Sequence, residues 1–587
     1  MKKLKEKIKI SKEEKKENKL ESKLRSPWTR FYKDVPKHLN YPDMMMWELI
    51  DDASKMYPNY VALEYFGQEI TYSKLVSMIH EAARALRALG VNENDVVTIC
   101  APNMPQSIVM FYAINMVGAV ANMIHPLSAE NEILNYLTIS NSTFVFSIDI
   151  ACDKLLNIID KTRVKKIVVM TANGNMPIFM SAMYWLVQGR KTKVPFDKSN
   201  IMSWRDFIDF GYMFNDEYIV KRSKYDPAVI LYSGGTTGKP KGILLSNNNF
   251  NALAIQSHLM ADPSKAGDSV LSIMPIFHGF GLGVCIHTPL ICGMRCILIP
   301  QFNYKKFGNL IKKHRPNFIV GVPTLYEGLL KNKDIKGNDM SSVTCVVSGG
   351  DMMLPELKRK VDRFLEGHGS SAKVRIGYGL TEGSAASCLT PSGEYRDGTI
   401  GIPFPDTYYK IVKIGTHDEL PYGEDGEICI HGPSVMMGYL NDVKETMQTL
   451  REHNDGLLWL HTGDIGAMDE DGFVYFKQRL KRIIISSGYN IYPTYIENVI
   501  SSHPDVLTCT VIGVDHPYKV QVAKAYIVLK DGVNPTEKIK NEIKELCKKN
   551  LAKYSLPSEY EFRDSLPRTL VGKVAFKELA DENKNVN

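Results

Sequence analysis

The chain has 587 residues, of which 44% are hydrophobic and 23% are charged, so it has the composition of an ordinary globular protein and is too long for a single core. Residues 1–26 carry +6 of the net charge of +7, because they hold eleven Lys and Arg against five Glu. The rest of the chain is nearly neutral, which argues against a nucleic-acid-binding surface on it, since phosphate binding needs clustered positive charge.

The basic tail, residues 1–26, is expected to be flexible and solvated. Its apolar residues are scattered singly among charges, so it does not have the pattern of a signal peptide. The ten cysteines are dispersed along the chain, which favours a reducing, cytoplasmic compartment. Peripheral contact of the tail with the inner face of a membrane, or with a partner protein, stays open as an alternative.

From about residue 44 onward, helical and strand patterns alternate. The segments 47–57 and 72–90 carry apolar residues at helical spacing, and the second ends at Gly90 as a helix C-cap would. The alternation predicts doubly wound α/β subdomains that bind ligands at the carboxyl ends of their strands. Short apolar runs predict buried strands over residues 95–103, 143–148, 165–170, 228–233, 269–278, 296–300, 318–323 and 344–350.

Two apolar segments raise the question of membrane contact. Residues 107–127 are near the lower length limit for a membrane span, but their two asparagines and terminal His-Pro favour a buried helix followed by a strand. Residues 175–193 are rich in Met and aromatic residues and close on basic residues. We expect a helix packed on its own subdomain there, with lipid contact as the alternative.

The pattern changes near residue 400. Short strands with turn signals predict a β-rich subdomain over roughly residues 406–479. A helix at 495–503, strands at 508–514 and 523–529 and a charged helix at 536–554 then predict a compact α+β unit. We place the boundary between an N-terminal domain, residues 27–479, and a small C-terminal domain, residues 480–587.

A glycine-rich loop, "YSGGTTGKPKG" over 232–242, follows one predicted strand. It is not a Walker A loop, because Ser233 stands where that motif needs glycine, and Pro240 follows the lysine where it needs a hydroxyl. Backbone N–H groups and the hydroxyls of Thr236 and Thr237 can surround a triphosphate instead, with Lys241 adding positive charge.

This loop resembles the phosphate loop of the adenylate-forming superfamily, which includes acyl-CoA synthetases, luciferases and the adenylation domains of peptide synthetases. One position that is commonly Ser or Thr in the family is Gly234 here. The resemblance covers roughly residues 40–580 and implies a large ATP- and acyl-binding domain followed by a small mobile one. Further motifs follow in the family's order, namely "GYGLTE" at 377–382, "HTGD" at 461–464, "QRLKRIIISSGYNIYP" at 478–493 and "PRTLVGKV" at 567–574.

The resemblance also implies ATP, Mg²⁺ and coenzyme A as reactants and cofactor. Glu382 and Thr236 match the family's magnesium-binding positions, and Tyr378 matches the ring that stacks on adenine. Asp464 matches the carboxylate that binds the ribose hydroxyls, with Arg479 on the ribose–phosphate side. The full set that the resemblance implies for nucleotide binding is Ser233, Gly235, Thr236, Thr237, Gly238, Lys241, Gly349, Gly350, Tyr378, Gly379, Thr381, Asp464 and Arg479.

The C-terminal motifs imply a two-step reaction with a domain rotation between the steps. Lys573 matches the lysine that bridges the acyl carboxylate and the α-phosphate during adenylation. Lys481 occupies the family's hinge. Ser487, Gly488 and Tyr489 lie on the face that approaches the CoA channel in the second step.

The residues expected near the acyl channel indicate the class of acid substrate. His278 resembles the family's gate residue, and Gly379 stands where acetate-specific members have tryptophan, so we expect an open pocket and a medium- or long-chain fatty acid. Aryl and bile-type acids stay open. So do a ligase that loads an acyl carrier protein and, as a rival class, a non-catalytic regulator that binds an acyl nucleotide.

Overall fold

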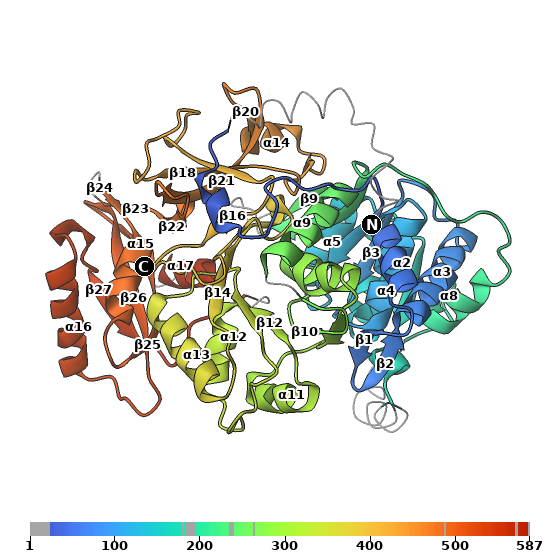
Figure 1. The fold of residues 1–587 in the computed structure, drawn as a ribbon, viewed down its shortest axis with the longest axis horizontal. Helices are drawn as coiled ribbons and strands as arrows, with labels where there is room; N and C mark the ends of the chain where they lie inside the picture. Colours follow the sequence, from blue (N-terminus) through green and yellow to red (C-terminus); the bar gives the residue numbers. More distant parts are fainter. Residues whose placement is uncertain are drawn as a thin grey trace.

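The computed structural model describes residues 24–177, 181, 194–233, 240–261, 264–486, 489–569 and 573–584. Most of the predicted tail and most of the 175–193 segment therefore lie outside the described residues. Figure 1 shows a large body built around three sheets and a smaller C-terminal unit, in orange and red, at one side of it. Among the described helices, none has the length and the apolar content needed to cross a membrane.

The first large sheet has eight strands in the order β19-β9-β8-β4-β3-β5-β6-β7. Its central strands are parallel, and β8 turns back into the antiparallel β9. The glycine-rich loop joins these two strands, so it leaves the sheet at the carboxyl end of β8. The strands are β3 (Val96–Cys100), β4 (Val120–Ile124), β5 (Phe144–Ile148), β6 (Lys166–Met170), β7 (Ile201–Ser203), β8 (Pro227–Ser233), β9 (Lys241–Ser246) and β19 (Gly438–Tyr439).

The second large sheet has nine strands in the order β16-β15-β14-β13-β12-β10-β11-β1-β2. The run from β14 to β1 is parallel, so the loops after β12, β13 and β14 leave from one edge. Two of these loops contain the glycines that the sequence places near the ligand. The strands are β1 (Val61–Tyr65), β2 (Gln68–Thr71), β10 (Ser269–Ser272), β11 (Arg295–Leu298), β12 (Phe318–Gly321), β13 (Cys345–Ser348), β14 (Val374–Tyr378), β15 (Cys388–Leu389) and β16 (Ile402–Pro403).

Helices surround the two sheets. Helix α4 is buried along its whole length, as expected for a helix that is apolar on all sides, and β4 follows it, so the expected buried helix and strand over 107–127 are confirmed. Gly90 has a φ of 91° just after α3, which confirms the predicted helix end. The helices are α2 (Met46–Met56), α3 (Tyr72–Ala88), α4 (Pro105–Met116), α5 (Glu130–Ser140), α6 (Cys152–Ile158), α8 (Trp204–Gly211), α9 (Asn247–Met260), α10 (Thr288–Ile291), α11 (Phe307–His314), α12 (Pro323–Leu330) and α13 (Pro355–Gly367).

One predicted strand is much shorter than expected. The 269–278 strand ends at Ser272 because the side chain of Asn103 replaces the next strand contacts. Its amide nitrogen donates to the carbonyls of Ser272 and Met274, both at 2.9 Å, and its oxygen accepts from the N–H of Ile276 at 2.7 Å. The chain then turns into the wide π-helix η7 (Phe280–His287).

The β-rich subdomain forms a five-stranded antiparallel sheet over residues 408–479, as predicted. Its strand β19 crosses to pair with β9, which brings this subdomain against the edge of the eight-stranded sheet. The elements are β17 (Tyr408–Val412), β18 (Gly426–His431), α14 (Val443–Thr449), β20 (Leu450–Glu452), β21 (Leu458–Met468) and β22 (Val474–Arg479).

The C-terminal unit has its own sheet, in the order β24-β23-β26-β25 with β27 beside β26, and its own apolar core over residues 484–551. The predicted boundary at 479/480 coincides with the end of β22 and stays a prediction. The elements are η10 (Leu480–Arg482), β23 (Ile484–Ser486), β24 (Tyr489–Ile491), α15 (Pro493–Ser501), β25 (Val506–His516), β26 (Val520–Leu529), α16 (Glu537–Asn550), β27 (Glu559–Phe562) and α17 (Phe576–Lys584).

Candidate active site

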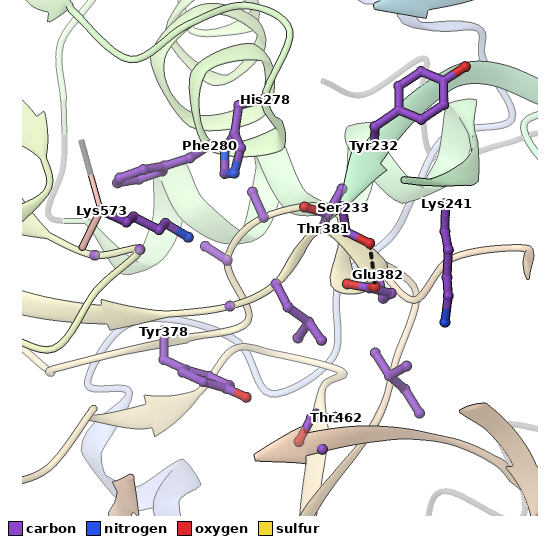
Figure 2. A pocket seen from close by; sticks show the side chains of 18 of the residues that line it. Tyr232, Ser233, Lys241, His278, Phe280, Tyr378, Thr381, Glu382, Thr462 and Lys573 are labelled. Carbon is purple, nitrogen blue, oxygen red and sulfur yellow. Dashed lines mark hydrogen bonds between the residues drawn. The ribbon is translucent and has the colours of Figure 1, made fainter. Parts of the chain in front are cut away.

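A cavity of about 1060 Å³ is lined by residues of the two large sheets, the β-rich subdomain and the C-terminal unit. That volume is at the upper end of what small-molecule sites enclose, so it accommodates a nucleotide and a second ligand together. The predicted site residues that line it are Ser233, Lys241, His278, Gly349, Gly350, Tyr378, Gly379, Thr381, Glu382, Arg479, Lys481 and Lys573. Figure 2 shows several of these side chains converging from different elements.

Glu382 lines this cavity from the short helix η9 (Thr381–Gly383), which follows β14. The hydroxyl of Ser233 donates to its Oε1 at 3.2 Å, and the hydroxyl of Tyr439 donates to the same oxygen at 2.9 Å. Both hydrogen bonds end on Oε1, so Oε2 is the oxygen left for a ligand. A carboxylate oxygen held this way, next to hydroxyl groups, fits the oxygen ligands that Mg²⁺ prefers.

Lys241 is held at the edge of the cavity by an acidic partner. Its ammonium forms an ion pair with Glu445 of α14 and lies 5.2 Å from the centre of the Tyr439 ring. Lys481, an exposed residue of η10, has a pKa below the usual lysine value because of partial desolvation and the nearby charge of Lys241. A phosphate entering this region therefore meets two cations, one of which is already neutralised by a carboxylate.

Tyr378, Asp464 and Arg479 form a second polar group, on β14, β21 and β22. The hydroxyl of Tyr378 donates to Asp464 Oδ2 at 2.6 Å, and Arg479 Nε lies 3.3 Å from Asp464 Oδ1. Asp464 and Arg479 are directly opposed in the β21–β22 pairing, which explains why they meet. Burial raises the pKa of Asp464, and the charge of Arg479 opposes this shift.

The remaining lone pairs of Asp464 suit the hydroxyls of a ribose. Its side chain is 2% exposed, and its Oδ1 accepts no hydrogen bond from the described residues. A buried acceptor without a donor is unfavourable unless a ligand supplies one. Two adjacent ribose hydroxyls are donors of the right kind, so this carboxylate fits the sugar of ATP.

The glycines after β13 and β14 bring backbone close to the cavity. A Cβ on Gly350, where φ is 77°, would lie 3.7 Å from Lys573 Cε. A Cβ on Gly379 would lie 1.7 Å from the carbonyl oxygen of Ala385. Backbone fills the space that a Cβ would take, so the glycine permits this close approach. The expectation that glycine at 379 opens pocket volume stays a prediction.

His278 and Phe280 form the wall on the side of the π-helix, as Figure 2 shows. Nδ1 of His278 accepts from the N–H of Phe280 at 3.3 Å, which fixes the ring against the helix start. Burial, together with the charge of Lys573, lowers the pKa of His278 to about 3, so the imidazole is neutral. Beyond it the cavity wall is mainly apolar, formed by Met123, Ile124, Ala261, Phe277, Val284, Val347, Cys388 and Leu389.

Lys573 reaches this cavity from the C-terminal unit (Figure 2). The segment before it is tied to the N-terminal body by an ion pair between Arg568 and Glu327 at 3.3 Å. Burial and the charge of Arg479 lower the pKa of Lys573, while Asp351 and Asp464 act in the opposite direction. The structure therefore places a partly desolvated cation where two anionic reactants would have to meet.

Several predicted residues lie outside the described part of the chain: Gly235, Thr236, Thr237, Gly238, Ser487 and Gly488, with the side chain of Tyr489. The predictions for them are not tested. Sequence reasoning also missed Tyr439 and Glu445, which hold Glu382 and Lys241. Neither has a local signal, because the contacts depend on the pairing of β19 with β9.

The chain matches two family models, "AMP-binding enzyme" over residues 50–440 and "AMP-binding enzyme C-terminal domain" over residues 495–573. It is 32% identical over 566 residues to a long-chain-fatty-acid–CoA ligase of Bacillus subtilis, covering 95% of this chain and 98% of that protein. A ligase of the same name from Escherichia coli O6:H1 is 30% identical over 576 residues, with the same coverage. Among solved structures, ATP-bound MatB from Rhodopseudomonas palustris superposes with a TM-score of 0.79 at 25% identity, over 92% of this chain and 100% of that one.

Proposed function

The chain belongs to the AMP-binding enzyme family, and from this membership we propose that it is an ATP-dependent fatty-acid–CoA ligase. In the first step a carboxylate attacks the α-phosphate of ATP and gives acyl-AMP and pyrophosphate. In the second step the thiol of coenzyme A attacks the acyl carbon and gives acyl-CoA and AMP. Relatives that are ligases of long-chain fatty acids match over 95% of the chain, which supports a long-chain acid.

The observation that carries this proposal is the convergence of Lys573, Glu382 and Tyr378 on one cavity with an apolar wall, with Asp464 hydrogen-bonded to the Tyr378 hydroxyl. We assign Asp464 and Arg479 to the ribose and Tyr378 to the adenine ring. Glu382 would hold Mg²⁺, which would neutralise charge on the phosphates. Lys573 lies between the carboxylate and the α-phosphate. Bringing two anions together needs positioning and charge compensation more than acid–base chemistry, and this site offers both.

The arrangement of the C-terminal unit suits the first step, because Lys573 already lies in the cavity. In the second step the thiol of coenzyme A has to reach the same acyl carbon that Lys573 serves in the first. We therefore propose that the chain divides at 479/480 and that the C-terminal unit rotates about Lys481 between the steps. This rotation would bring Ser487, Gly488 and Tyr489 to coenzyme A.

The test is ATP- and Mg²⁺-dependent loss of free CoA thiol with a panel of acids, from acetate through long-chain fatty acids to benzoate and a bile acid, with AMP measured in parallel. We expect thiol loss equal to AMP formation, with the highest kcat/KM for a long-chain acid. Acyl-adenylate without thiol loss would identify a carrier protein as the acceptor. No ATP turnover with any acid would leave a non-catalytic binding protein and overturn the proposal.

A further inference from the structure

A cluster of three histidines lies in the β-rich subdomain, and no step of the proposed reaction uses them, although His461 and its partner Glu427 also line the cavity. His461 is on β21, His453 follows β20, and His417 is in the loop between β17 and β18. Each offers a ring nitrogen, and these atoms all lie within 4.8 Å of one another. His453 and His461 are 4% and 6% exposed, whereas His417 is half-buried.

Two of the three rings are in direct contact. Nε2 of His453 lies 2.9 Å from Nε2 of His461. Two neutral imidazoles repel at this distance if both lone pairs point at each other, so a proton or a cation has to lie between them. If it is a proton, Nδ1 of His453 carries a lone pair, and that buried atom has no hydrogen-bond partner in the described chain.

The carboxylate of Glu427 orients the ring of His461. Nδ1 of His461 donates to Glu427 Oε2 at 2.9 Å, and the other oxygen of Glu427 accepts from the N–H of Gly463 at 3.0 Å. This hydrogen bond sets the tautomer of His461, so its Nε2 presents a lone pair to the cluster. A carboxylate that orients a histidine in this way is the usual support of a metal-binding imidazole.

The third ring, His417, stacks on its neighbour, and the nearest cation is compensated by a carboxylate. The ring of His417 stacks on His453, with centres 4.5 Å apart, and its imidazole makes no hydrogen bond to the described residues. The nearby cation Lys410 is paired with Asp455 at 2.8 Å, so it does not present an uncompensated charge to the cluster. Tetrahedral zinc with Zn–N of about 2.0–2.1 Å needs nitrogens roughly 3.3 Å apart. The three ring nitrogens lie within 4.8 Å of one another, so the rings have to close slightly around an ion.

From this geometry we propose that His417, His453 and His461 bind one divalent transition-metal ion of the zinc type, supported by Glu427. Imidazole ligands select such ions over Mg²⁺, which prefers oxygen. On binding, the metal takes the place of the proton shared by the two Nε2 atoms, and that proton moves to Nδ1 of His453. The site joins the loop between β17 and β18 to the strand that carries Asp464.

The test is Zn²⁺ titration of the untagged full-length chain after chelator dialysis, by calorimetry and by competition with a chromophoric chelator, in millimolar Mg²⁺. We expect one Zn²⁺ per chain. His417→Ala and His453→Gln should each weaken binding at least tenfold, in line with the effect of losing metal-site residues. The matched control is His516→Ala, which removes a histidine of the C-terminal unit and should bind Zn²⁺ as the parent chain does.

Two further readings separate loss of the site from loss of the fold. His417→Ala should keep the thermal midpoint and the Zn²⁺-free activity of the parent chain, and X-ray absorption of the zinc complex should show imidazole ligands. Zinc binding by His417→Ala as tight as by the parent chain overturns the proposal. So does absence of stoichiometric binding, which would leave only a hydrogen-bonded imidazole pair.

Discussion

Replacing Lys573 by alanine should separate the two steps of the proposed reaction. The ammonium lies in the cavity near Gly350, partly removed from water. At about 4 Å and an effective dielectric constant of about 20, its attraction to one anion is about 4 kcal/mol. Water that enters the vacated space and Arg479 recover part of this, so we expect a loss of roughly 3 kcal/mol, or about 10²-fold in the rate of adenylation.

The assay measures each step by itself. Acid-dependent ATP–pyrophosphate exchange reports adenylation, and CoA-dependent consumption of preformed acyl-AMP reports the second step. Lys573→Ala should slow the first about 10²-fold and leave the second within about twofold, since the rotated unit takes the lysine away. Lys577→Ala, at an exposed position of α17, is the control and should change neither. An equal fall in both steps would refute the assigned role.

Three other changes test separate parts of the structure. Tyr439→Phe removes a hydrogen bond to Glu382 that is worth about 1 kcal/mol. The Mg²⁺ concentration that gives half-maximal activity should rise several-fold, and an unchanged Mg²⁺ titration contradicts this. Gly379→Ala puts a Cβ 1.7 Å from the Ala385 carbonyl oxygen and should lower the thermal midpoint of unfolding by several degrees. An unchanged midpoint together with a changed preference for acyl chain length would instead favour open space beside Gly379. His287 is fully buried and its pKa is lowered to about 3, so below pH ~6.5 the unfolded state binds a proton that the folded state does not. The free energy of unfolding should therefore be about 2 kcal/mol lower at pH 5 than at neutral pH. In urea unfolding, His287→Gln should make the free energy of unfolding less dependent on pH. The same pH dependence in both proteins would exclude this contribution of His287.

Local patterns determined much of the fold. The apolar run at 107–127 indicated α4 and β4 because a helix buried on all sides must be apolar on all sides. The predicted strands at 143–148 and 165–170 are β5 and β6, since short β-branched and aromatic runs are read from adjacent residues alone. The motifs around Asp464 and Lys573 likewise identified the family, because each is a contiguous string with a distinct order along the chain.

Contacts between distant segments were decided only by the tertiary structure. Tyr439 reaches Glu382 because β19 pairs with β9, and that register depends on how two subdomains pack. Backbone atoms of Ala385 and Ala386 fill the space beside Gly379, and this contact cannot be predicted from the residue types. His417, His453 and His461 meet because three loops and strands of one sheet converge. The sequence shows the chemistry of which each side chain is capable. Which side chains form one site depends on long-range packing, whose energy is spread over many contacts that no short segment contains.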